Sequence, residues 1–220
     1  MKETLSQAIV FLPPRYRPYF LPAALWSLGV IVAVLAAYTA YQTRIEGRNA
    51  RASAAIHAIT SAIEDGAGIG LDQLYVDFAA DAGDGHYPFG AMPYAKWLFE
   101  EGRYEEAGNV YRRVIERGDD PYVRDLARLG MINVMFELEE GTDTIDQIAL
   151  QYESANVYSQ LALDYLLGDV YAAKGAYEEA VSYYEQALNM ANNLGDQNFA
   201  NNINYKISAM FSARLQQGGQ

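Results

Sequence analysis

The chain has 220 residues, of which 51% are hydrophobic, and it contains two histidines and no cysteine. This length suits one medium-sized domain with an accessory segment, and the lack of cysteine excludes disulfides and thiolate-based sites. The net charge of −12 is uneven: residues 1–60 hold six basic and two acidic side chains, whereas residues 61–220 hold ten basic and 26 acidic ones. The larger part therefore repels nucleic acid, while the basic beginning suits lipid headgroups.

A long apolar segment lies near the start of the chain. No charged residue occurs from Pro18 to Thr43, and residues 20–40 are almost wholly apolar. About 20 helical residues cross a hydrocarbon core of roughly 30 Å. We therefore predict a transmembrane helix over residues 19–41 after a tail over residues 1–18, which is either an interfacial helix or an unstructured segment. A cleaved signal peptide is the alternative, which the prolines in its long first part disfavour.

Small residues recur at helical spacing inside this segment. They are Gly29, Ala33, Ala37 and Ala40. Such a stripe predicts packing against another transmembrane helix, and the alternative is a lipid-facing row of alanines. Basic residues flank the segment on both sides, so the positive-inside rule does not fix its orientation.

The next part of the chain predicts a helical extension and linker over residues 42–87. Apolar residues from Ile45 to Ile63 fall on one face of a helix. Three glycines within residues 65–70 end this helix, and a short amphipathic helix begins at Leu71.

A repeated motif dominates the rest of the sequence. Gly-x-Tyr-Glu-Glu-Ala begins at Gly102 and again at Gly175, and each copy is followed by a tyrosine four residues later. Around the second copy, Gly168 and Ala180 are small, which lets two antiparallel helices approach closely while tyrosines fill the space around them. The motif glycine supplies the left-handed turn between the helices.

Spacing extends this interpretation to three stacked helix pairs. Gly141 lies 39 residues after Gly102 and 34 before Gly175, so we predict a middle pair over residues 122–140 and 142–152 with Gly141 as its turn. Residues 196–215 have apolar residues on one face, as a capping helix has. The expected fold is all-α: one transmembrane helix, then a short helical solenoid over residues 88–215 and a tail over residues 216–220.

The repeat resembles the tetratricopeptide repeat, although Asp164 stands where that family often has tryptophan. The whole layout resembles the family of the ancillary SecYEG translocon subunit, which is bitopic with a tetratricopeptide-like periplasmic domain. This resemblance implies a single-pass protein of the bacterial inner membrane whose C-terminal domain faces the periplasm. It also implies contacts with the translocon, periplasmic chaperones or emerging chains.

A repeat solenoid binds its partners through a concave face lined by the first helix of each pair. By motif position we predict a partner groove formed by Phe89, Met92, Lys96 and Phe99 in the first pair and by Ala162, Tyr165, Asp169 and Ala172 in the last. The alternative is that these residues pack against the helix at residues 42–64 or against the C-terminal cap.

The sequence predicts no catalytic, cofactor or metal site. The acidic pairs at 105–106 and 178–179 suit the first turns of helices, and the glycines at 66, 68 and 70 follow no strand. Asp81, Asp84 and His86 lack the later glutamate of a calcium loop. We therefore expect a membrane-anchored scaffold or chaperone-recruiting accessory factor at the secretion translocon, with proteins as partners and no nucleic acid. A stably bound structural subunit of another membrane complex is the alternative.

Overall fold

The computed structural model describes the backbone of residues 17–139, 141–152 and 156–217, and side-chain surroundings from residue 30 to residue 215 within these ranges. These residues form α-helices joined by turns, with no strand among them. The chain divides into two compact units, residues 1–51 and residues 52–220. Residues 1–16 of the expected N-terminal tail and residues 218–220 of the C-terminal tail lie outside the described part.

The first unit consists of the long helix α2, Arg17–Glu64, which continues into the second unit from Ala52 onward. There is no break at residue 41, where we expected the membrane segment to end. Between residues 30 and 35 the large apolar side chains are 54–61% exposed. In the part with described surroundings, no helix is long and apolar enough to span a bilayer. Residues 19–29 of the predicted span lie outside that part.

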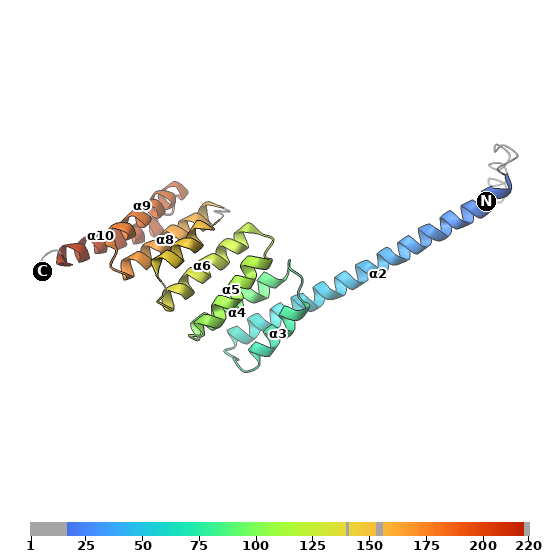
Figure 1. The fold of residues 1–220 in the computed structure, drawn as a ribbon, viewed down its shortest axis with the longest axis horizontal. Coiled ribbons are helices and arrows are strands. Elements are labelled where there is room, and N and C mark those ends of the chain that lie inside the picture. The colour runs from blue at the N-terminus through green and yellow to red at the C-terminus, as the bar shows by residue number, and fades with distance from the viewer. Residues whose placement is uncertain (1–16, 140, 153–155, 218–220) are drawn as a thin grey trace. The chain divides into compact units, whose positions relative to one another are not determined.

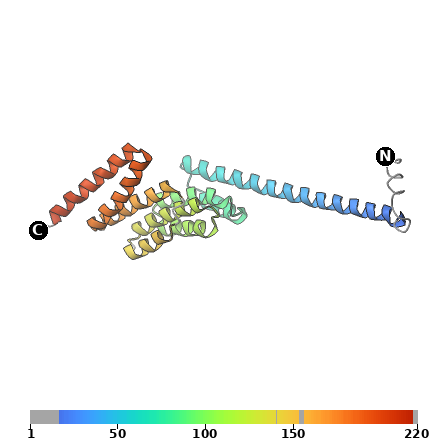
Figure 2. The ribbon, with the colours of Figure 1, turned by 90° about the horizontal axis from the view of Figure 1, so that it is seen from above.

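The second unit is a succession of helices that pack against their neighbours. Figures 1 and 2 show them following one another side by side. After the end of α2 they are α3 Leu71–Asp81, α4 Tyr87–Glu100, α5 Tyr104–Arg117, α6 Pro121–Glu137, α7 Thr142–Leu150, α8 Val157–Ala173, α9 Tyr177–Leu194 and α10 Gln197–Gln217. The all-α solenoid is thereby confirmed for this part of the chain.

Two of the three expected turn glycines adopt the left-handed conformation. Gly102 and Gly175 have φ of 75° and 76°, and each lies between two packed helices. Gly141 lies in the turn between α6 and α7, but its φ and ψ of −65° and 152° are outside the left-handed region. Glu139, with φ of 57°, is the left-handed residue after α6. Here an acidic residue carries the strained conformation that glycine adopts at little cost.

Side-chain caps are present at the starts of α6, α8 and α10, the last from Asp196, which accepts a 3.0 Å hydrogen bond from the backbone N–H of Phe199. Asp120 accepts a 2.9 Å hydrogen bond from the backbone N–H of Tyr122 and precedes a proline at the first position of α6. Asn156 and Ser159 form a reciprocal capping box at the start of α8. With this cap, α8 begins at Val157, four residues before Leu161, the residue at which we had expected the last helix pair to begin.

The close approach expected at Gly168 is present, and the ring of Tyr184 makes it. A Cβ atom on Gly168 would lie 2.5 Å from two ring atoms of Tyr184, which is 1% exposed. Gly130 of α6 has the same relation to the ring of Tyr111, with a Cβ distance of 2.4 Å. Glycine on one helix and tyrosine on its neighbour thus set the helix spacing in two places.

The helices bury three apolar clusters in succession. The first joins α2, through Ile59, to α3, α4, α5 and α6. The second joins α6, through Ile132, to α7 and α8. The third joins α8, α9 and α10, with Ile203 fully buried. Because the apolar residues form three successive clusters and not one central core, stability is distributed along the solenoid.

Asp164 is a buried carboxyl group in α8, and it gives the first testable prediction. It is 3% exposed; its Oδ1 accepts a 2.9 Å hydrogen bond from Gln160, and its Oδ2 has no partner within the described residues. Burial raises its pKa above the ordinary value of 3.8. The folded state therefore holds this proton more tightly than the unfolded state, and ionisation costs stability as the pH rises above about 4.

We expect Asp164→Leu to stabilise the fold by about 1–3 kcal/mol at pH 7, with a smaller gain at pH 4, where a larger share of the native carboxyl groups is protonated. Urea unfolding at the two pH values measures the difference. Asp164→Asn is the matched control, because it removes the charge and keeps a polar group. An equal gain for Asp164→Leu at both pH values would contradict the role of the charge.

Candidate protein-binding surfaces

The outer face of α4 carries the part of the predicted groove that is open. Phe89 is 61% exposed, and Lys96 is exposed and forms an ion pair of 3.4 Å with Glu100. Met92 and Phe99 are half-buried and pack against the first core cluster. These two therefore pack within the solenoid, while Phe89 and Lys96 are exposed.

Aromatic packing on the inner side of α4 holds this face in place. The ring of Tyr94 stacks on Tyr75 at 4.0 Å between centroids, and a Cβ on Gly90 would lie 2.5 Å from the Phe78 ring. The Tyr94 hydroxyl donates a 2.7 Å hydrogen bond to Asp72. Phe89 therefore projects from a helix whose position is fixed by buried contacts on its other side.

Asp72 ties α3 to both α4 and the start of α5. It accepts a 3.0 Å bond from Arg103, which also pairs with Glu106 at 2.6 Å. Hydrogen bonds from Arg103 and Tyr94 hold the pKa of Asp72 below its ordinary value. Glu106, interpreted from sequence as a solvated first-turn carboxylate, is engaged in this network, and Arg103 also lies 5.5 Å from the Trp97 ring.

The loop between α3 and α4 contains one acidic residue, Asp84, and this residue forms an ion pair within the fold. Asp84 accepts a 2.8 Å bond from Arg117, whose guanidinium also lies 4.0 Å from the ring of Tyr87. Arg117 donates a further hydrogen bond to the Ala82 carbonyl at 2.9 Å. Within the part of the chain that the structure describes, no group of three His, Cys, Asp or Glu residues could hold a metal ion.

The part of the predicted groove on α8 is covered by the capping helix. The ring of Tyr165 packs on Phe199 of α10 at 5.0 Å, and its hydroxyl donates to Asn202 at 3.3 Å. Lys206 of α10 forms an ion pair with Asp169 and lies 4.7 Å from the Tyr165 ring. Ala162 and Ala172 are half-buried, and Ala172 packs against the third cluster.

Under the capping helix α10, the polar side chains Tyr184 and Lys206 both bond to Asp169. The Tyr184 hydroxyl donates a 2.6 Å bond to Asp169. Burial and this bond raise the pKa of Tyr184 above its ordinary value, so it stays a donor. Burial opposes the charge on Lys206, but Asp169 outweighs that effect and the pKa of Lys206 is raised. Of the predicted groove residues, Phe89 and Lys96 on α4 are thus exposed, whereas the other two on α4 and the four on α8 are half-buried.

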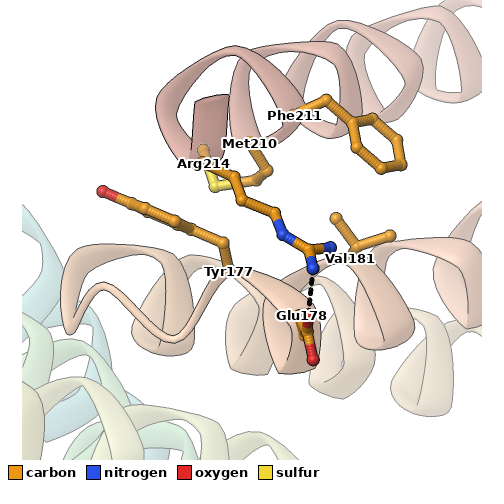
Figure 3. A pocket seen from close by; sticks show the side chains of 6 residues that line it. All are labelled: Tyr177, Glu178, Val181, Met210, Phe211 and Arg214. Carbon is orange, nitrogen blue, oxygen red and sulfur yellow. Dashed lines mark ion pairs between the residues drawn. The ribbon is translucent and has the colours of Figure 1, made fainter. Parts of the chain in front are cut away.

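A small pocket between α9 and α10 was not anticipated from sequence. Tyr177, Glu178 and Val181 line it from α9, and Met210, Phe211 and Arg214 line it from α10 (Figure 3). Its volume is about 160 Å³, Arg214 and Glu178 bridge it at 2.6 Å, and Phe211 is 51% exposed. The sequence feature that could have indicated this pocket is the pair Met210 and Phe211, which lie on the apolar face of the capping helix near its end.

The predicted packing stripe of α2 lies partly outside the described side chains. Ala33, Ala37 and Ala40 are exposed, and the surroundings of Gly29 are not described. The stripe therefore stays a prediction.

Comparison with known proteins gives one match. A family model described as a tetratricopeptide repeat-like domain matches residues 20–211, from the start of the apolar segment to within α10. No curated protein and no solved structure matches the chain.

Proposed function

Because the chain belongs to the tetratricopeptide repeat-like family, whose domains generally bind proteins, we propose that it is a membrane-anchored scaffold for other proteins. In this proposal it recruits chaperones or assists the secretion translocon at a bacterial inner membrane, with its C-terminal domain in the periplasm. The observation that carries the binding role is the open face of α4, where Phe89 is exposed on a helix fixed from behind. Exposed aromatic side chains on rigid elements are typical anchors of protein interfaces.

The charge of the repeat part narrows the class of partner. Residues 61–220 carry 26 acidic and ten basic side chains. A partner surface with basic residues around an apolar contact would be attracted by this field, and its association would be faster at low salt.

The apolar part of α2 supports the proposed anchor. Val30, Ile31, Val32, Val34 and Leu35 are each more than half exposed, and together with the exposed Ala33 they cover all sides of the helix. A helix that is apolar all round needs an apolar environment, and the sequence continues this character back to residue 20. The family match also starts at residue 20, so the family includes this segment. The periplasmic side comes from the translocon-subunit resemblance alone.

We expect Phe89→Ala to weaken partner binding by about 2 kcal/mol, or roughly 30-fold, as for an aromatic hot spot. Stability should change by less than about 0.5 kcal/mol, because the side chain is mostly exposed. Co-purification of the tagged chain from mild detergent, with translocon subunits and chaperones quantified, measures the loss. Tyr205→Ala is the matched control, since Tyr205 on α10 is 77% exposed.

Reproducible absence of translocon subunits from the purified wild-type complex would exclude that membrane machine. Partners recovered equally with Phe89→Ala would exclude the α4 face. If the chain is instead a stably bound structural subunit, the double variant Gly29→Leu with Ala33→Leu should release it from its complex. Phe89→Ala should then leave the complex intact.

A further inference from the structure

An open groove lies at the turn between α4 and α5, beside the end of α6. Its volume is about 270 Å³, and it is lined by Gly102, Arg103, Tyr104, Glu105, Glu106 and Leu138. The apolar part of the groove consists of Leu138, which is 41% exposed, and of Tyr104, whose ring packs on Phe99 at 5.2 Å between centroids. Phe89 lies eleven residues before the end of α4, or roughly 16 Å along the helix axis, so this groove is separate from the Phe89 surface.

Six exposed glutamates surround this groove, and we call them the groove glutamates. They lie within residues 96–106 and 137–139, at positions 100, 101, 105, 106, 137 and 139. The same residues include two basic side chains, and each of these already forms an ion pair with a groove glutamate: Lys96 with Glu100 at 3.4 Å and Arg103 with Glu106 at 2.6 Å. Six acidic and two basic side chains leave the region strongly negative.

Four of the groove glutamates lie where a negative charge does not help the fold. Glu100 and Glu101 are at the end of α4, and Glu137 and Glu139 are at the end of α6. The last turn of a helix carries a partial negative charge, so a basic residue there adds stability and an acidic residue costs it. Neither helix has a basic residue in its last turn. Because Leu138 lines the groove together with residues 102–106, both helix ends meet there, and both dipoles favour a bound cation.

The arrangement of the carboxylates suits a peptide segment better than a metal ion or a small molecule. In the part of the chain that the structure describes, no three acidic side chains come close enough together to hold a metal ion. The groove is open, and its volume is below the range of about 300–1,000 Å³ that small-molecule sites have. Separate carboxylates beside an apolar surface match an apolar side chain with positive charges on either side of it, which a short peptide segment supplies.

We propose that this groove docks a basic segment of a partner protein, with an apolar side chain against Tyr104 and Leu138 and with flanking lysines or arginines paired to the groove glutamates. The inference rests on the protein-binding role proposed above, but on neither the Phe89 surface nor the membrane anchor. The contact combines a small apolar area with ion pairs that are open to solvent. Its affinity is therefore sensitive to salt and to the loss of single charges near the groove.

The test measures the binding of a synthetic peptide to the full chain in micelles of a neutral detergent. The peptide has capped ends, one leucine between two Lys-Arg pairs, and a fluorophore whose anisotropy reports binding. We expect saturable binding whose affinity falls about tenfold when about 0.5 M salt screens the charges. Replacing the leucine of the peptide by serine should weaken binding about fivefold, because the apolar contact is lost.

Two double variants separate the groove from the overall charge of the chain. Glu105→Gln with Glu139→Gln should weaken binding of the leucine peptide about fivefold, since it removes two exposed carboxylates beside the groove. Glu179→Gln with Glu185→Gln removes the same charge from exposed positions on α9 and should leave the affinity nearly unchanged. The two variants are matched, because Glu179 lies in the first turn of α9 as Glu105 lies in the first turn of α5.

Three results would each overturn the inference: no binding of the basic peptide to the wild-type chain, equal losses in the two double variants, or equal binding of the leucine and serine peptides. None of these results affects the Phe89 surface, which is tested by the recovery of protein partners. Phe89→Ala should leave peptide binding unchanged, and a loss of peptide binding in this variant would place the basic segment on α4 and also overturn the inference.

Discussion

Replacing Gly168 by alanine is expected to destabilise the last helix pair by about 1–3 kcal/mol. The added Cβ would lie 2.5 Å from Cδ1 and Cε1 of Tyr184, far inside van der Waals contact. The ring has little room to move, because it is buried and its hydroxyl is held by Asp169 at 2.6 Å. Either α8 and α9 separate or Tyr184 loses this hydrogen bond. Urea unfolding monitored by circular dichroism measures the loss of stability.

Gly141→Ala is the control for this substitution. Apart from the glycine itself and its chain neighbours, no atom of the described residues lies within 4 Å of the position that the alanine Cβ would occupy, and φ of −65° suits alanine. This variant should be neutral or more stable by up to about 1 kcal/mol, because alanine restricts the unfolded chain. Equal effects of the two substitutions would contradict the claim that glycine and tyrosine set the helix spacing.

Asp125→Ala is expected to have the largest effect, a loss of about 3–5 kcal/mol. Asp125 is fully buried in α6 and pairs with Arg128 at 3.2 Å, which is 8% exposed. It also accepts a 3.4 Å hydrogen bond from Ser159, a member of the capping box of α8. Alanine would remove the carboxylate that pairs with the buried Arg128 guanidinium. It would also remove the hydrogen bond to Ser159 and weaken the contact between α6 and α8.

The double variant Asp125→Leu with Arg128→Met tests the cause of that loss. It removes both charges and fills the space with apolar side chains, so it should recover most of the stability lost in Asp125→Ala. Thermal unfolding of the wild type and the two variants gives the comparison. A double variant less stable than Asp125→Ala would show that the buried charges are needed for more than mutual neutralisation.

The repeated motif made the helix pairs predictable, because its glycine and alanine have local physical roles. Gly102 and Gly175 turn the chain, and Ala107 and Ala180 are fully buried. Gly141 lies in the turn where it was expected, but spacing alone does not say which of several neighbouring residues takes the left-handed conformation. Glu139 takes it instead, under the constraint of the packed ends of α6 and α7.

The division of the predicted groove could not be derived from motif position. Phe89 and Ala162 hold equivalent places in the two copies of the motif, as do Met92 and Tyr165. Whether such residues are open depends on what packs over them, and Tyr165 meets Asn202 across 37 residues of sequence. Helical periodicity carries no information about such a contact. The apolar face of residues 196–215 did predict a cap, but not that it would close over α8.

Photo-crosslinking from α4 in native membranes tests the binding claim most directly. A photoreactive phenylalanine analogue is placed at Phe89, and in separate chains at Tyr165 and Tyr205. We predict adducts with another protein from position 89 and few from position 165, which the capping helix covers, or from position 205 on the exposed side of α10. Adducts from positions 165 or 205 that equal those from position 89, or none from position 89, would contradict the account.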